Sequence, residues 1–154
     1  MYYYLIIIII VILDQVSKLL AIHYVKPLNT IPILENVFHL TYAQNTGAAF
    51  SILSNKISLL TFITTIFIII LLIYLYRISS KDKKFNLLTF SLSLIIGGAL
   101  GNLVDRMRLG YVVDFFDFRL INFAIFNVAD CFIVVGSILL VVLIIFEEKL
   151  NKVK

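Results

Sequence analysis

Four long apolar runs divide the chain, and each is long enough to cross a lipid bilayer. A helix needs about 20 mostly apolar residues to span the hydrocarbon core of a membrane. A chain of 154 residues also fits one domain by length. The pattern therefore predicts an all-α integral membrane protein, a single domain over residues 1–154, with transmembrane helices at about residues 3–25, 57–76, 86–104 and 128–146.

The first apolar run begins at the N-terminus and could be mistaken for a cleavable signal peptide. It has no basic segment before it and no small-residue cleavage site after it, and both are typical of such peptides. Apolar residues also resume after Lys18 and continue to Val25. We therefore expect this run to be a retained first spanning helix.

The segments between the runs predict a topology. Residues 77–84 and 147–154 are densely basic and would lie on one side of a four-helix protein, which favours both termini in the cytoplasm. On the other side, residues 37–43 and 111–118 are rich in strand-forming residues. Residues 47–53 have the composition of a short interfacial helix. We expect a small extracytoplasmic β-element and this helix to rest on the helix ends.

Composition narrows the class of protein further. Hydrophobic residues make up 62% of the chain and charged residues 14%, and the mean hydropathy is +1.07. The net charge of +4 comes with no basic patch interleaved with aromatic residues, so a nucleic-acid partner is not expected. One cysteine and two distant histidines exclude an intrachain disulfide and argue against a metal site.

Five of the nine acidic residues are aspartates among residues that a bilayer would accept. A carboxylate at the centre of a spanning helix costs about 2.5–3.5 kcal/mol on insertion scales. Such groups persist only where they face a protein interior or a polar cavity. The five aspartates therefore indicate a functional site, and they are Asp14, Asp105, Asp114, Asp117 and Asp130.

The first candidate residues lie in the first two segments of the chain. Asp14 and Lys18 are four residues apart on one helix face, in the favourable acid-before-base order. They are either a structural ion pair or direct contacts to a substrate. Asn45 and Gly47 form an Asn-x-Gly turn signal, and the asparagine could also hydrogen-bond an extended ligand. Both pairs of alternatives stay open.

The end of the third run concentrates polar residues. Asn102, Asp105 and Arg106 are three or four residues apart, so their side chains can meet at one helix end. Just before them, Gly97 and Gly101 form a GxxxG pattern that allows another helix to approach closely.

Asp114 and Asp130 have the strongest signs of proton chemistry. Asp114 lies between Val113 and Phe115, an apolar setting that raises a carboxyl pKa. Asn127 and Asp130 imitate a helix capping box, so capping alone could explain them. However, both aspartates fall on one side of the membrane, and two facing carboxylates can share a proton for acid–base catalysis.

Five motifs, in order, carry a family resemblance: Asp14-Gln-Val-Ser-Lys18, Asn45-Thr-Gly-Ala-Ala-Phe50, Gly101-Asn-Leu-Val-Asp-Arg106, Val113-Asp-Phe115 and Phe126-Asn-Val-Ala-Asp130. With four spans, this order resembles the lipoprotein signal peptidase family, bacterial signal peptidase II. The resemblance implies a multi-pass aspartyl endopeptidase of the bacterial cytoplasmic membrane, active near the extracytoplasmic face. Its substrate would be a diacylglyceryl-modified prolipoprotein, cut just before the lipidated cysteine.

The resemblance also assigns residues. Asp114 and Asp130 match the catalytic pair, and the family's other polar site residues match Asp14, Asn45, Asn102, Asp105, Arg106 and Asn127. Together with Lys18 and Gly47, these are expected to bind the substrate or support the site. We expect no metal or organic cofactor. We also expect the protein to contact membrane phospholipid and to be a monomer. The glycines Gly97, Gly98 and Gly101 are expected to leave room for a small-residue peptide, and Cys131 to be a small buried hydrophobe.

Two other functions remain possible on the sequence alone. A small proton-coupled transporter would use the buried aspartates as a relay through the membrane. A lipid-binding protein without chemistry would not need the carboxylates. Only Asp14 lies well inside a predicted span, so the sequence favours the peptidase over both alternatives.

Overall fold

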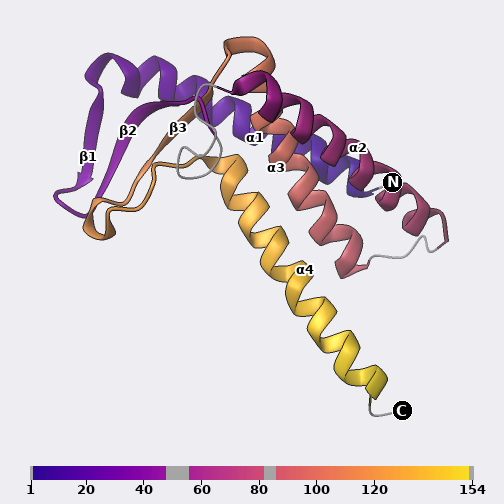
Figure 1. Ribbon diagram of the computed structural model, residues 1–154. Helices are drawn as coiled ribbons and strands as arrows, with labels where there is room; N and C mark the ends of the chain where they lie inside the picture. The colour runs from indigo at the N-terminus through magenta and orange to yellow at the C-terminus, as the bar shows by residue number, and fades with distance from the viewer. Residues whose placement is uncertain (1, 48–55, 82–85, 153–154) are drawn as a thin grey trace.

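The computed structural model describes residues 2–47, 56–81 and 86–152. Its long helices are α1 (Tyr2–Leu20), α2 (Ile57–Lys81), α3 (Leu87–Leu109) and α4 (Val128–Lys152). Each carries a stretch long and apolar enough to cross a membrane. The four predicted spans are therefore confirmed, and the protein is a multi-pass membrane protein (Figure 1).

The first span changes its helical form near its end. α1 stops at Leu20, and the chain continues as a π-helical turn (Ala21–Val25) and a short 3₁₀ turn (Lys26–Leu28). Pro27 lies at the start of that last turn, where its missing N–H costs nothing. The predicted run over residues 3–25 is thus helical throughout, but only its first part is regular α-helix.

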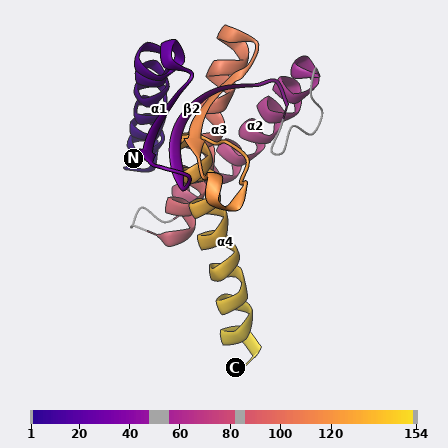
Figure 2. The same ribbon diagram turned by 90° about the vertical axis from the view of Figure 1, so that its left-hand side faces the viewer.

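α3 forms the centre of the bundle, in contact with each of the other three long helices. In its most apolar stretch 72% of the residues are buried inside the protein, against 11% for α2 and 11% for α4. Figure 2 shows α3 between α1 and α2, and Figure 1 shows the far half of α4 leaving the bundle. Side chains that must be shielded from lipid are therefore best placed on α3.

Glycines on α3 let the neighbouring helices approach closely. A Cβ at Gly97 would lie 2.9 Å from Ile10, and one at Gly101 would lie 2.5 Å from the Asp14 carboxylate, both on α1. A Cβ at Gly98 would collide with the backbone carbonyl oxygen of Ala129 on α4. Close helix packing is confirmed, but the expected room for a substrate peptide is wrong, because the protein's own helices fill it.

α3 extends beyond the apolar run that predicted it. The expected span ended at residue 104, whereas the helix continues to Leu109 and is closed by Gly110 in the left-handed conformation, at φ 76°. Glycine is favoured at this position because it lacks a Cβ. The additional turn carries Asp105 and Arg106, so these polar side chains are held by regular helix.

A three-stranded antiparallel sheet covers one end of the bundle, in the order β1-β2-β3. β2 (Phe38–Asn45) and β3 (Val112–Asp117) confirm the two predicted extended segments. The third strand, β1 (Thr30–Leu34), was not predicted; it contains Pro32, which a strand tolerates at a sheet edge, where β1 lies. The predicted interfacial helix, apart from Gly47, lies outside the described residues.

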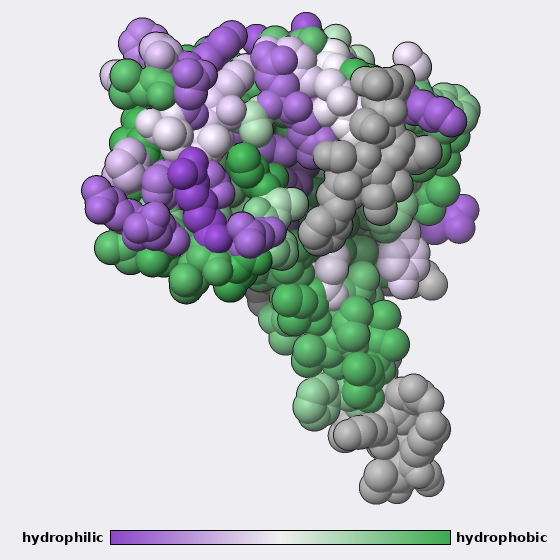
Figure 3. All heavy atoms as spheres, turned by 60° about the vertical axis from the view of Figure 1, so that its left-hand side comes forward, coloured by the Kyte–Doolittle hydropathy of each residue, from purple (hydrophilic) through white to green (hydrophobic). Residues whose placement is uncertain are grey.

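Polar and apolar surfaces separate along the molecule. Figure 3 shows hydrophilic residues gathered around the sheet, while the projecting part of α4 is apolar. Exposed aliphatic side chains such as Ile138, Val141 and Ile145 cover that part of α4. A surface of this kind is stable in lipid and not in water. Figure 1 places the start of α1, the end of α2 and the far end of α4 away from the sheet.

The contact between α3 and α4 gives a first prediction. Gly98→Ala adds one carbon against the Ala129 carbonyl, so α4 must shift and the protein is expected to lose about 1–3 kcal/mol of stability. Val141→Ile adds the same carbon on an exposed face of α4 and is the matched control. Thermal unfolding in detergent micelles measures both variants. Equal unfolding temperatures would contradict the tight packing.

Candidate active site

The N-terminus of α4 fixes Asp130 by a reciprocal pair of hydrogen bonds. The Asp130 backbone N–H donates to the Asn127 side-chain oxygen at 3.0 Å, and the Asn127 backbone N–H donates to Asp130 Oδ2 at 3.1 Å. This is the capping box that the sequence indicated. It uses one oxygen of the Asp130 carboxylate, and the other accepts a hydrogen bond from the Asn102 amide at 2.8 Å.

Asp114 lies on β3, where the sheet meets the helix ends. Its side chain is 2% exposed, and each oxygen accepts an amide hydrogen bond, from Asn45 at 3.0 Å and from Asn127 at 2.6 Å. Burial, together with the nearby Asp130 carboxylate, raises the pKa of Asp114 to about 7. The expected upward shift is therefore present, with burial as its largest cause.

Two asparagines connect the two carboxylates. Asn127 donates from its amide to Asp114 and also to the Asn102 side-chain oxygen at 3.1 Å. Asn102 in turn donates to Asp130. A side-chain amide has one NH₂ donor group and one oxygen acceptor. This series of hydrogen bonds therefore leaves each amide, and so each carboxylate, with little choice of orientation.

Asn45 makes the turn that the Asn-x-Gly pattern indicated, and it also reaches the carboxylate pair, whereas its contact with a ligand stays a prediction. Its side-chain oxygen accepts from the Gly47 backbone N–H at 2.9 Å, which makes a turn, while its amide donates to Asp114. Arg106 extends this link, because its guanidinium donates to the Gly47 carbonyl at 3.2 Å. The turn after β2 is therefore held against the end of α3.

A buried cluster of charged side chains lies next to the two carboxylates. Lys18 contacts Asp14 at 2.9 Å and Asp105 at 3.0 Å, and Lys18 and Asp14 are at most 2% exposed. The sequence predicted the first contact but not the second, since Asp105 comes from another helix. Gln15 was also missed: its amide donates to Asp105 at 2.9 Å and to the Gly101 carbonyl at 3.2 Å.

A cavity of about 960 Å³ opens beside the two carboxylates. Its polar wall includes Asn45, Asn102, Arg106, Asp114 and Asp130, and its apolar wall includes Phe67, Ile95, Ala99, Ile133 and Val134. The Lys18 cluster and Asn127 do not line it. Cys131 does, as an exposed residue, so the expectation that it is buried is wrong: the first turn of α4 faces the cavity on that side.

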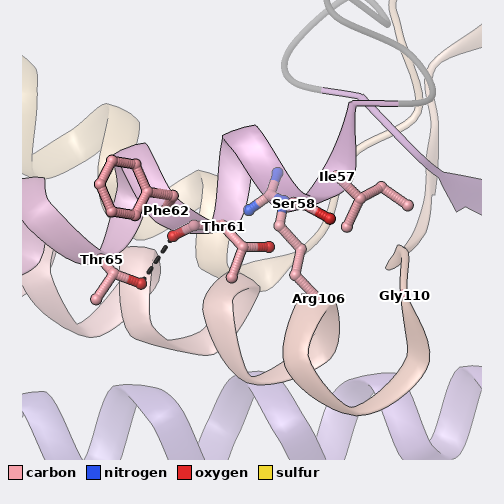
Figure 4. A pocket seen from close by; sticks show the side chains of 7 residues that line it. All are labelled: Ile57, Ser58, Thr61, Phe62, Thr65, Arg106 and Gly110. Atoms are coloured by element: carbon pink, nitrogen blue, oxygen red, sulfur yellow. Dashed lines mark hydrogen bonds between the residues drawn. The ribbon is translucent and has the colours of Figure 1, made fainter.

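Arg106 separates this cavity from a second hollow of about 700 Å³. Figure 4 shows its guanidinium among residues from the start of α2, with the Ser58 and Thr61 side chains nearby. Arg106 is attracted electrostatically to Asp130, Asp114 and Asp105. It is therefore the cation nearest to the open side of the carboxylate pair among the residues that line either hollow.

Asp117 lies apart from this site. Its carboxylate accepts from Thr41 at 2.6 Å and pairs with Arg119 at 2.9 Å on the sheet. Burial acts to raise the pKa of Asp117, but these two hydrogen bonds and the Arg119 charge outweigh it, and the pKa is lowered. Asp117 does not line the cavity. Within the described ranges, no three His, Cys, Asp or Glu side chains are grouped to hold a metal ion.

Comparison with known proteins identifies the family. The family model described as signal peptidase (SPase) II matches residues 6–146, which is most of the chain. The chain belongs to the signal peptidase II family. It is therefore a peptidase, a hydrolase of peptide bonds, as the order of its motifs implied.

Individual relatives align with this chain over nearly their whole length. The chain is 48% identical to a lipoprotein signal peptidase of Halothermothrix orenii, covering 91% of this chain and 92% of the relative. It is 43% identical to one of Brevibacillus brevis, covering 99% and 100%. A solved bacterial membrane enzyme at 35% identity superposes with a TM-score of 0.81 and covers 98% of this chain and 91% of that one.

The position of Asp117 predicts that it can be replaced. Asp117→Asn removes an ion pair whose arginine is 42% exposed, and such pairs contribute at most about 1 kcal/mol. Peptidase activity of the variant is expected to stay within about twofold of the parent, measured by cleavage of a lipidated precursor in micelles. A loss above about tenfold in folded protein would instead connect Asp117 to the site.

Proposed function

We propose that this protein is a membrane aspartyl endopeptidase that removes the signal peptide of diacylglyceryl-modified prolipoproteins just before the lipidated cysteine. Family membership supports the reaction, and the relatives named above are lipoprotein signal peptidases. The observation that carries the aspartyl mechanism is the pair Asp114 and Asp130, joined by two asparagines and bordering one cavity.

The pair would act with one shared proton. One carboxylate takes a proton from a water molecule, whose oxygen then bonds to the scissile carbonyl carbon. The protonated partner gives its proton to the carbonyl oxygen. As the peptide C–N bond breaks, the first carboxylate gives its proton to the leaving nitrogen, and the partner takes a proton back from a hydroxyl of the intermediate, whose C=O re-forms. The pair thereby regains its starting state.

Electrostatics favour different roles for the two residues. Asp130 lies at a helix N-terminus, which stabilises negative charge, and its Oδ2 accepts a backbone N–H. Asp114 is more deeply buried and has a raised pKa. We assign the proton to Asp114 in the resting enzyme and the role of base to Asp130, while the titration belongs to the pair.

The other residues of the site would hold the pair and the substrate. Asn102 and Asn127 orient the carboxylates, and Asn45 fixes Asp114 from the sheet. Arg106 lines the cavity and could bind a backbone carbonyl of the substrate. Gly47 anchors Arg106 through its carbonyl oxygen. Asp14, Lys18 and Asp105 would act from behind the cavity wall.

The proposal includes an orientation and a lipid environment. Basic segments near residues 77–84 and 147–154 favour both termini in the cytoplasm of a bacterial cell, with the site near the extracytoplasmic face of the cytoplasmic membrane. The apolar cavity wall between α2 and α4 suits acyl chains and surrounding phospholipid. We propose a monomer that needs no metal or organic cofactor.

A proton-coupled transporter is the main alternative, and the arrangement of acids disfavours it. A relay needs carboxylates spread through the membrane depth. Asp105, Asp114 and Asp130 instead gather where the helix ends meet the sheet, and Asp14 is bound to Lys18 just behind them. Family membership points the same way.

Substitution of the two aspartates tests the mechanism. Asp114→Asn and Asp130→Asn, made separately, keep the size of each side chain and remove its acid–base function. Each should lower the cleavage rate of a lipidated precursor by about 10²–10⁴-fold, the usual contribution of such a group. Asp117→Asn is the matched control, and unchanged turnover in either dyad variant would rule out the dyad.

The raised pKa predicts the pH dependence. Because Asp114 keeps its proton up to about pH 7, the pair holds one proton below that value and none well above it. Activity should therefore fall as the pH rises through about 7, because the acid is lost. A profile of kcat/KM over pH in micelles measures this limb. Activity that keeps rising into the alkaline range would contradict the assignment of the proton.

A further inference from the structure

Lys18 makes three polar contacts and lies wholly behind the cavity wall. Its ammonium group contacts Asp14 at 2.9 Å, Asp105 at 3.0 Å and the Asn102 side-chain oxygen at 2.9 Å. An ammonium group has three donors, so all are used. The side chain is 2% exposed and does not line either hollow described above. A contact between Lys18 and substrate is therefore excluded by this arrangement.

The two carboxylates that bind Lys18 each also bind the backbone next to a dyad aspartate. Asp14 accepts from the Ala129 backbone N–H at 3.0 Å, and Ala129 directly precedes Asp130. Asp105 accepts from the Val113 backbone N–H at 3.1 Å, and Val113 directly precedes Asp114. Since Lys18 binds both carboxylates, the start of α4 and strand β3 are fixed to one common point.

The third contact of Lys18 determines the direction of the Asn102 amide. The Asn102 oxygen faces the Lys18 ammonium and also accepts from Asn127, so its NH₂ group must face Asp130. A flipped amide would place NH₂ against the ammonium and against the Asn127 amide. Lys18 thus keeps a donor directed at the carboxylate of Asp130.

We propose that Lys18 is a positioning residue that sets the separation of the Asp114 and Asp130 carboxylates and the direction of the donor to Asp130. This role rests on the dyad proposed above. This role goes beyond that of a structural ion pair, because the three partners of Lys18 each contact a dyad residue or the residue directly before one. α1, which contributes none of the cavity lining, would then still control catalysis.

Lys18 also affects the dyad through its charge. Its positive charge acts to lower the pKa of Asp114, against the larger effects of burial and of Asp130. Among the described residues, Arg106 and Asp105 on α3 and Asp14 on α1 also bring charge near the pair, and the titratable thiol of Cys131 lies next to Asp130. Removing the Lys18 charge leaves less to stabilise the carboxylate, so the pKa of Asp114 rises. The alkaline limb of the activity profile would move to higher pH.

Lys18→Met tests the proposal, because it keeps an unbranched side chain one atom shorter and removes the charge and the donors. We expect kcat to fall by about 10²-fold through misplacement of the dyad. KM should change less than about twofold, and the alkaline limb should shift upward. Lys26→Met makes the same change on an exposed lysine and should leave kcat, KM and the pH profile unchanged.

A second variant covers the case in which two unpaired carboxylates prevent folding. Lys18→Met/Asp105→Asn removes one negative charge as well, and should fold while remaining impaired in kcat. Unchanged kcat and pH profile in either folded variant, or a change confined to KM, would overturn the positioning role. Failure of both variants to fold would assign Lys18 to folding alone. Full activity of Asp114→Asn or Asp130→Asn would refute the dyad, whatever Lys18→Met does.

Discussion

The burial of one lysine between two carboxylates is the constraint around which this small membrane protein is organised. Lys18 is 2% exposed, and an unpaired ammonium there would cost several kcal/mol. Asp14 and Asp105 compensate its charge from α1 and α3, which requires those helices to lie close together. Gly101 permits this approach, since any side chain there would occupy the space of the Asp14 carboxylate.

The same groups serve folding and the site. Asp130 caps α4 with one oxygen and presents the other to Asn102 and the cavity. Asn127 caps the helix through its side-chain oxygen and orients Asp114 through its amide. Because each polar group has two uses, few polar atoms need to be buried. Sharing polar groups in this way suits a chain of which 62% is hydrophobic, because each additional buried polar atom would need a partner.

What the sequence could predict depended on whether the signal was local. The four spans follow from hydropathy, because lipid permits only segments with internally satisfied backbones. The Asn127–Asp130 cap and the Asp14–Lys18 pair also follow, since their partners lie three or four residues apart. The contact of Lys18 with Asp105 and the role of Gln15 depend on how α1 meets α3, which no local pattern encodes.

The errors have the same origin. β1 was not predicted: it contains Pro32, which a strand tolerates at a sheet edge, and a position at the edge is a property of the whole sheet. Cys131 was expected to be buried because small thiols usually are. It is exposed because the first turn of α4 turns that side toward the cavity.

The divergence of α4 explains how one site can meet both water and lipid. The polar end of the cavity adjoins the sheet, where the hydrophilic surface gathers (Figure 3), and its apolar wall continues down α2, α3 and α4. A tightly closed four-helix bundle would bury the carboxylates without access for a lipid-embedded chain. Asp14, Gly98 and Asn127 fix the start of α4 beside the proposed dyad, and Gly136 brings the middle of the helix close to α3, while its far half leaves the bundle.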